Sequence, residues 1–304
     1  ITFFEILTAA YFYKAAKYPK NINLIETGLF HRFDATNILN QNLASVVTSI
    51  GLDHLDWLPN NEQTVEKIIF EKTSKLLNSN IIVAKQNSNE ISVHIKNTIK
   101  DNKSKKIFFY ENYSFSPEDN NFFYYKDEFG GMKLPVPNIN GQFQLENIST
   151  AIATLRNIKQ LEINDEHIKT GITKIESIAR LQEISEGKLK DLVKENKLLV
   201  DGSHNPLGAK VLNDYLESLN CNIHIILGMM ANKDHQEYMS YFKNITTLTT
   251  IDIPNQPNSI GGKELKNKLN NQKKIQYKES ILEAIKSIPV NKNDLILITG
   301  SLYL

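Results

Sequence analysis

Apolar residues recur with two different periods in the first part of the chain. They follow helical spacing over residues 4–17 and in "EQTVEKIIFEKTSKLL" (62–77). Three short apolar runs predict strands: "NLIE" (23–26), "ASVVTSI" (44–50) and "NIIVA" (80–84). Because helices or long connections separate these runs, we expect the strands to form a parallel sheet.

From residue 90 to 136 the pattern changes to short runs rich in β-branched and aromatic residues. The runs are "ISVHI", "KIFFY", "FFYYK" and "MKLPV", separated by polar clusters and by Gly130-Gly131. This pattern predicts an antiparallel insert rich in hairpins. "GQFQLENISTAIATLRNIKQL" then predicts a long helix, and "NDEHIKTGITKI" a shorter one.

After residue 177, strands and helices alternate strictly. Strands are predicted at "KLLVD", "NIHIILG", "TTLTTID" and "DLILITG", with helices over 206–219, 235–242, 261–269 and 279–288. Right-handed βαβ units pack in one way, so this part reads as a Rossmann-like domain. The sequence therefore predicts an α/β protein of two domains, residues 1–177 and 178–304.

Composition and charge narrow the class of protein. The chain has 304 residues, with Lys+Arg 35 against Asp+Glu 34, so its formal net charge of +1 favours neither nucleic acid nor acidic lipid. Cys221 is the sole cysteine, which excludes an internal disulfide and a cysteine zinc cluster. No apolar run approaches the ~20 residues of a membrane span. We expect a cytoplasmic monomer whose partners are small molecules.

Polar residues near the ends of the predicted strands are the first candidates for chemistry. The sequence contains neither a G-x-x-x-x-G-K-[ST] phosphate loop nor a G-x-G-x-x-G turn. Glu26 ends "NLIE", His54 closes "SIGLDH", and Lys72 lies on the following helix. A carboxylate and an imidazole at neighbouring strand ends can share Mg²⁺, although histidine is the less expected ligand. Taken alone, each of the three residues is more often structural.

The second half presents a polar turn in "LLVDGSHNPLGAKVL". Asp201 and His204 follow a strand, where ligands gather in open α/β sheets. The alternative is that Asn205 only caps the helix that Pro206 begins. Arg180, near the domain boundary, could clamp a phosphate or simply pair with a surface acid.

Taken together and in this order, a set of sequence blocks resembles the folylpolyglutamate synthase/dihydrofolate synthase family of the Mur ligase superfamily. The blocks are "TFFEILTAAYFY", "ETGLFHRFDATN", "SIGLDH", "FEK", "GQFQLENISTAIA", "ARLQ", "DGSHNPLGA", "LGMMANKD" and "GSLYL". The resemblance implies an ATPase and pterin-binding domain over 1–177 and a Rossmann-like glutamate-ligase domain over 178–304. It also implies an amide ligase that uses ATP and Mg²⁺ to join L-glutamate to dihydropteroate or folates through an acyl phosphate.

The same resemblance assigns roles to individual residues. It implies Glu26 and His54 as magnesium ligands, Lys72 as a carbamylated lysine, and His204 as a further catalytic residue. Asn147, Arg180 and Asp201 are the implied ATP contacts. The implied pterin-pocket residues are Thr2, Phe3, Phe4, Glu5, Phe33, Asp34 and Ala35.

Two departures from the family pattern affect the expected activity. Phe30-His31 stands where the family has a glycine pair, and glycine usually permits positive φ or a close backbone approach. The phosphate loop and the serine that completes the magnesium site are missing, so we expect an N-terminally truncated chain with little turnover. One alternative is a catalytically dead remnant that binds folate or acts as a scaffold, and another is a Mur-type peptide ligase.

Overall fold

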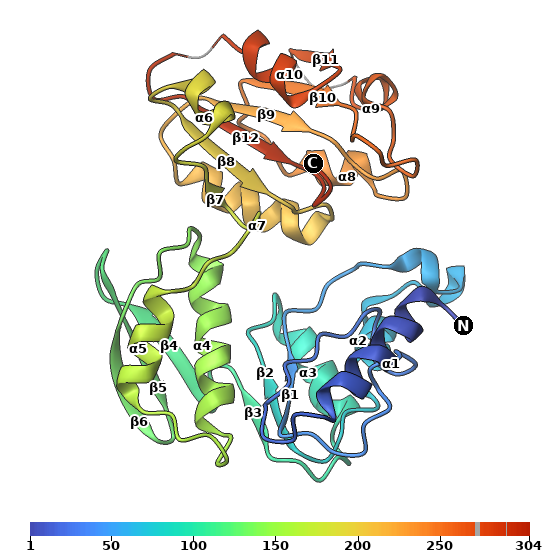
Figure 1. Ribbon diagram of the computed structural model, residues 1–304, viewed down its shortest axis with the longest axis vertical. Coiled ribbons are helices and arrows are strands. Elements are labelled where there is room, and N and C mark those ends of the chain that lie inside the picture. The colour runs from blue at the N-terminus through green and yellow to red at the C-terminus, as the bar shows by residue number, and fades with distance from the viewer. Residues whose placement is uncertain (271–273, 290) are drawn as a thin grey trace. The chain divides into compact units, whose positions relative to one another are not determined.

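The contacts within the chain divide it into two units. A computed structural model describes residues 1–270, 274–289 and 291–304 (Figure 1). Unit 1 comprises residues 1–136 and 146–169, and unit 2 comprises 137–145 and 170–304. The functional division at residues 177 and 178 stays a prediction.

The helix α1 (Phe3–Ala15) opens unit 1 and begins with a capping box. The backbone N–H of Glu5 donates to Thr2 Oγ1 at 3.2 Å, and the Thr2 N–H donates to Glu5 Oε2 at 2.6 Å. Hydrogen bonding to the Glu5 carboxylate, chiefly from the Thr2 backbone N–H, lowers the pKa of Glu5. Thr2 and Glu5 therefore cap the N-terminus of this helix.

A parallel sheet forms the centre of unit 1. Its strands are β1 (Ala44–Val47), β2 (Asn80–Val83) and β3 (Lys106–Phe108), in the order β1-β2-β3. The helices α2 (Val65–Thr73) and α3 (Asn89–Thr98) pack on the sheet, and two short 3₁₀ helices, η1 (Leu55–Trp57) and η2 (Asn60–Glu62), precede α2. The shared apolar core includes Val47, Ile81, Val83 and Phe108 from the sheet and Ile68, Ile69, Ile95 and Ile99 from the α2 and α3 region.

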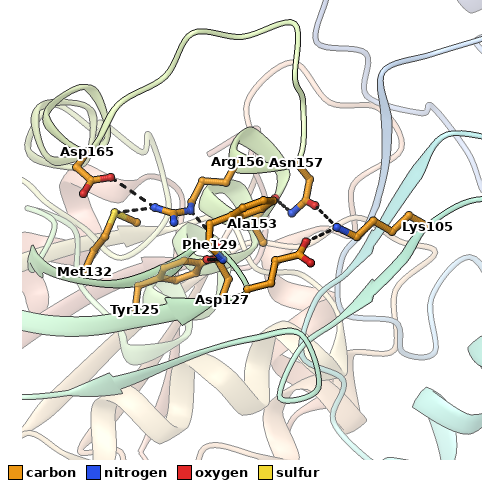
Figure 2. A network of polar contacts seen from close by, with 10 residues as sticks. Lys105, Tyr125, Asp127, Phe129, Met132, Ala153, Arg156, Asn157 and Asp165 are labelled. Atoms are coloured by element: carbon orange, nitrogen blue, oxygen red, sulfur yellow. Dashed lines mark hydrogen bonds and ion pairs between the residues drawn. The ribbon is translucent and has the colours of Figure 1, made fainter.

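The predicted antiparallel insert is present. It consists of β4 (Tyr113–Pro117), β5 (Phe122–Asp127) and β6 (Gly130–Pro135), paired in that order, and is followed by α4 (Gln142–Arg156) and α5 (Asp165–Thr173). Figure 2 shows how the end of α4 is tied to the insert: Arg156 Nε lies 2.9 Å from Asp127 Oδ2, which also accepts the Tyr125 hydroxyl at 3.0 Å. Lys105, just before β3, donates to Asn157 Oδ1 at 3.0 Å. These contacts connect the two sheets of unit 1 through the end of α4.

Unit 2 contains a six-stranded sheet in the order β11-β10-β9-β12-β8-β7. All neighbouring strands are parallel except β7, which is antiparallel to β8. The strands are β7 (Gln182–Glu183), β8 (Lys197–Asp201), β9 (Ile223–Leu227), β10 (Thr247–Ile251), β11 (Ile275–Lys278) and β12 (Leu295–Thr299). The helices are α6 (Lys188–Val193), α7 (Pro206–Glu217), α8 (His235–Ser240), α9 (Gly262–Lys268) and α10 (Ile281–Ser287).

Helices cover both faces of this sheet (Figure 1). Ile225 and Leu227 of β9 pack in one core with residues of α7, α8 and α9, whereas Ile226 packs in a second core with residues of α6 and α10. Successive side chains of a strand point to opposite faces, so burial on both faces explains the continuous apolar runs. The Rossmann-like architecture predicted from the alternation is confirmed.

Three sequence predictions about elements were wrong. "NLIE" is irregular and Leu24 is almost fully exposed, so Glu26 does not end a strand. "ISVHI" lies in α3, because Ser88 caps that helix and Ile95 and Ile99 are buried one turn apart. Residues 106–108 of "KIFFY" join the parallel sheet instead of the insert. Within the described residues, no helix is both long and apolar enough to cross a bilayer.

Candidate functional site

The carboxylate of Asp34 organises the loop over residues 28–36 in unit 1. Asp34 Oδ2 accepts the N–H groups of Gly28 and Leu29 at 3.0 and 2.9 Å, and Oδ1 accepts the N–H and hydroxyl of Thr36 at 3.0 and 2.6 Å. Burial alone would raise the pKa of Asp34, but these hydrogen bonds outweigh it and lower the pKa. Both carboxylate oxygens therefore serve to shape the loop.

Phe30, in the same loop, contacts two of the predicted site residues. Its φ of 53° lies in the left-handed region that favours glycine. Its ring meets the His54 ring edge-on, with the centroids 6.1 Å apart, and Lys72 Nζ lies 5.8 Å from the Phe30 centroid. The structure thus brings His54 and Lys72 against one aromatic ring, although the three residues are far apart in the sequence.

Lys72 lies half-buried in the last turn of α2, beside the loop that carries Asp53 and His54. Burial lowers the pKa of Lys72, and the charge of Asp53 opposes that shift only in part. His54 has a φ of 57°, its N–H donates to Asp53 Oδ1 at 2.9 Å, and its Nε2 lies 3.8 Å from Asp53 Oδ2. Lys72, His54, Asp53 and Phe30 form one group, which we call the Lys72 group.

An ion pair fixes the 28–36 loop to α2 immediately beside Lys72. Arg32 donates from Nε and Nη2 to the two carboxylate oxygens of Glu71 at 2.7 and 2.8 Å, and the Arg32 N–H donates to the Glu71 carbonyl at 2.9 Å. Burial favours the neutral acid, but the bonds from Arg32 and then Lys67 prevail and lower the pKa of Glu71. Sequence reasoning missed this pair, although each partner adjoins a predicted site residue.

The structure does not join Glu26 to the Lys72 group by any polar contact. Glu26 is exposed in the irregular segment before the 28–36 loop, and in the described part of the chain it makes no hydrogen bond or ion pair. Its carboxylate is therefore available to a ligand. Its assignment as a magnesium ligand stays a prediction.

Of the predicted pterin residues on α1, Phe4 packs against the 28–36 loop, which carries Phe33, Asp34 and Ala35. A Cβ atom on Gly28 would lie 2.5 Å from the ring of Phe4 and 3.0 Å from Asp34 Oδ2, so glycine permits this close packing. Phe3 and Phe33 are exposed, and the guanidinium of Arg32 lies 4.2 Å from the centroid of Phe33. Ala35 is half-buried in the same loop.

In unit 2, Asp201 connects the end of β8 to the segment 179–181. Asp201 is buried, and its two oxygens accept the N–H groups of Leu181 at 2.8 Å and Ser203 at 2.9 Å. The N–H of Gly202 donates to the Ala179 carbonyl at 2.8 Å. Both carboxylate oxygens of Asp201 thus hold backbone in place.

His204 lies in the same turn, and Arg180 lies beside it. Arg180 is exposed, and a Cβ on Gly202 would lie 3.0 Å from its Nη1 atom. His204 is half-buried, with Nδ1 2.9 Å from the Gly202 carbonyl oxygen. Asn205 caps α7 by accepting the N–H of Gly208 at 2.8 Å. Asp201 and His204 therefore share one turn of unit 2, and Arg180 lies beside it. Asn147 is exposed on α4 in unit 1.

A hydroxyl network beneath this turn was not predicted from the sequence. The buried Tyr238 of α8 lies 2.9 Å from Thr299 Oγ1 and 3.1 Å from Ser203 Oγ, measured from its hydroxyl oxygen. The N–H of Gly300, whose φ is +107°, donates to the Ser203 carbonyl at 3.1 Å. The network fixes the turn to the neighbouring strand β12.

Comparison with known proteins agrees with this architecture. Residues 180–302 match the family described as Mur ligase, glutamate ligase domain. The chain is 27% identical over 308 residues to the dihydrofolate synthase/folylpolyglutamate synthase of Buchnera aphidicola subsp. Schizaphis graminum, covering 100% of this chain and 69% of that protein.

Solved structures of folylpolyglutamate synthases are also similar to this chain. The E. coli FolC complex with ADP is 26% identical, with a TM-score of 0.76 over 91% of this chain. Folylpolyglutamate synthase of Mycobacterium tuberculosis, complexed with ADP and AMPPCP, is 18% identical with a TM-score of 0.85 and supports the fold alone.

Residues 180–302 therefore correspond to a Mur ligase glutamate ligase domain. Along its length it is a homologue of the folylpolyglutamate and dihydrofolate synthases. It spans 63% of the E. coli FolC chain.

Proposed function

We propose that this chain acts as an ATP-dependent ligase that forms an amide between L-glutamate and the carboxylate of dihydropteroate or a folate. ATP transfers its γ-phosphoryl group to the acceptor carboxylate, and the amine of glutamate then displaces phosphate from the acyl phosphate. The homology to enzymes named for these reactions supports the proposal. We propose further that the protein works as a cytoplasmic monomer.

The Lys72 group is the observation that carries the proposal. The lowered pKa of Lys72 increases the share of neutral amine near neutral pH. A neutral amine attacks the carbon of CO₂ and loses one proton, which gives a carbamate and replaces a positive charge by a negative one. In our proposal this modified Lys72 supports a divalent cation near His54.

The residues present suit a divalent cation such as Mg²⁺. Glu26 offers a carboxylate that has no other polar partner in the described part of the chain, and His54 offers an imidazole beside the carboxylate of Asp53. We propose Glu26 and His54 as the ligands. When bound, the ion would supply positive charge that offsets the negative charge of the transferred phosphoryl group.

The remaining residues position the substrates. We propose that the pterin ring contacts the exposed aromatic rings of Phe3 and Phe33 and the loop that Asp34 shapes. Arg180 and Asn147 are exposed and suited to contact ATP, with the Arg180 guanidinium on phosphate oxygens. Asp201 acts through the backbone that it holds, and His204 contributes from the same turn.

The proposal is tested by measuring phosphate release from ATP by the complete gene product that contains these residues. The reaction contains Mg²⁺, L-glutamate and one acceptor, either dihydropteroate, tetrahydrofolate or a nucleotide-linked peptide. We expect release that requires both glutamate and a pterin acceptor. Release with the peptide alone would instead indicate a Mur-type peptide ligase, and pterin binding without release would indicate a folate-binding remnant.

Variants of two neighbouring lysines test the role of Lys72. Lys72→Ala should lower the rate at least about tenfold, and added acetate should restore part of it. Lys75→Ala is the matched control, because Lys75 is exposed one turn further along the chain. A wild-type rate that is unchanged after removal of CO₂ and bicarbonate would contradict carbamylation.

A further inference from the structure

A second group of possible metal ligands lies on α2 and α3, apart from the residues used above. It contains Glu66 from the first turn of α2 and Glu90 and His94 from α3. One donor atom from each residue lies within 4.8 Å of the other two, and His94 Nε2 is 3.9 Å from Glu66 Oε1. The group thus combines an imidazole with two carboxylates from two separate helices.

Packing of the two helices determines where these side chains lie. Glu90 and His94 are four residues apart and therefore share one side of α3. The buried residues Ile68, Ile69 and Ile95 belong to one core, which holds α2 against α3. The donors are therefore brought together by the fold and not by a flexible loop.

We propose that Glu66, Glu90 and His94 bind a divalent transition-metal ion of the Zn²⁺ class and thereby connect α2 to α3. One imidazole nitrogen with two carboxylate oxygens suits Zn²⁺, whereas Mg²⁺ prefers oxygen ligands in octahedral geometry. Ligands bound tetrahedrally at about 2.1 Å lie roughly 3.4 Å apart. Glu66 and Glu90 are exposed and His94 is half-buried, so small side-chain rotations can close the present separations.

This proposal is independent of the ligase function. Its ligands differ from Glu26 and His54, and its readout is metal binding. Because α2 also carries Glu71 and Lys72, a bound ion would restrain the helix on which Lys72 lies. We therefore expect Zn²⁺ to raise the melting temperature of the protein.

The test is a titration of ZnCl₂ into the metal-free protein at neutral pH with excess MgCl₂. We compare wild type with His94→Gln and Glu66→Gln, which preserve side-chain size while removing one ligand each. His167→Gln is the matched control, since His167 is an exposed helical histidine beside an acidic residue, and His54→Gln reports on the other group.

We expect one equivalent of Zn²⁺ whose affinity falls at least about tenfold in His94→Gln and in Glu66→Gln. That equivalent should persist in His167→Gln and in His54→Gln, and the gain in melting temperature should vanish with His94→Gln. The proposal is overturned if wild type binds no Zn²⁺ at high micromolar concentration. It is equally overturned if His94→Gln and Glu66→Gln leave every equivalent intact.

Discussion

Replacing Asp201 by Asn should destabilise unit 2, because the Asp201 carboxylate accepts two backbone hydrogen bonds in a buried position. Asp201 is 5% exposed, and its oxygens receive the N–H groups of Leu181 and Ser203 at 2.8 and 2.9 Å. Asn has nearly the same shape but carries no charge and has one acceptor oxygen. Its NH₂ group must therefore face one of the two backbone donors.

The magnitude follows from these two bonds. A hydrogen bond to a charged group contributes about 1.5–3 kcal/mol, and a buried donor without an acceptor costs about 1–3 kcal/mol. Asp201→Asn loses one bond and weakens the other, so we expect the free energy of unfolding to fall by about 2–4 kcal/mol. Asp201→Ala loses both acceptors and should cost about 3–5 kcal/mol.

Urea unfolding followed by circular dichroism measures the loss of stability, and hydrogen exchange of peptides spanning residues 179–203 measures its location. The matched control is Asp214→Asn, which removes the same charge from an exposed position on α7 and should change stability by less than about 0.5 kcal/mol. If Asp201→Asn unfolds at the wild-type urea concentration with unchanged exchange in 179–203, the structural role assigned to this carboxylate is wrong.

Three further predictions follow from other contacts. Glu71→Gln removes the charge that pairs with Arg32, which is partly exposed, so urea unfolding should show a loss of about 1–3 kcal/mol. Burial lowers the pKa of His31 below its usual 6.5, so the free energy of unfolding should fall as the pH drops from 6.5 through the lowered pKa. Over the same pH range, the free energy of unfolding of His31→Leu should fall less. Gly300→Ala places a Cβ 2.5 Å from the Gly228 carbonyl oxygen at a φ of +107°, and thermal unfolding should show a loss above about 2 kcal/mol.

The sequence predicted unit 2 well because its strands are buried on both faces. Apolar runs such as 223–227 and 295–299 have no polar face that could be confused with a helix. Residues 91–95 were wrongly predicted as a strand, because the spacing of Ile91 and Ile95 fits both an alternating strand and one turn of a helix. The cap at Ser88 decided in favour of the helix. The short elements α6, β7 and β11 offered too little periodicity to predict.

For the site, sequence reasoning found residues but not the contacts between them. His54 was predicted just after a strand and Lys72 on the following helix, and the structure places both against Phe30. The pairing of Arg32 with Glu71 spans 39 residues, and that of Tyr238 with Thr299 spans 61. Such contacts depend on how helices and loops pack, and no local spacing in the chain encodes them.

Two of the acids predicted to contact ligands, Asp34 and Asp201, already use their oxygens on the protein itself. A carboxylate that accepts several hydrogen bonds would have to give them up to bind a ligand directly, at a cost of more than about 1 kcal/mol for each bond. Their exposed neighbours, Phe33 and Arg180, have no such restriction on their outer surfaces. Each of these two acids therefore fixes the backbone that presents an exposed group, and in our proposal the exposed group contacts the ligand.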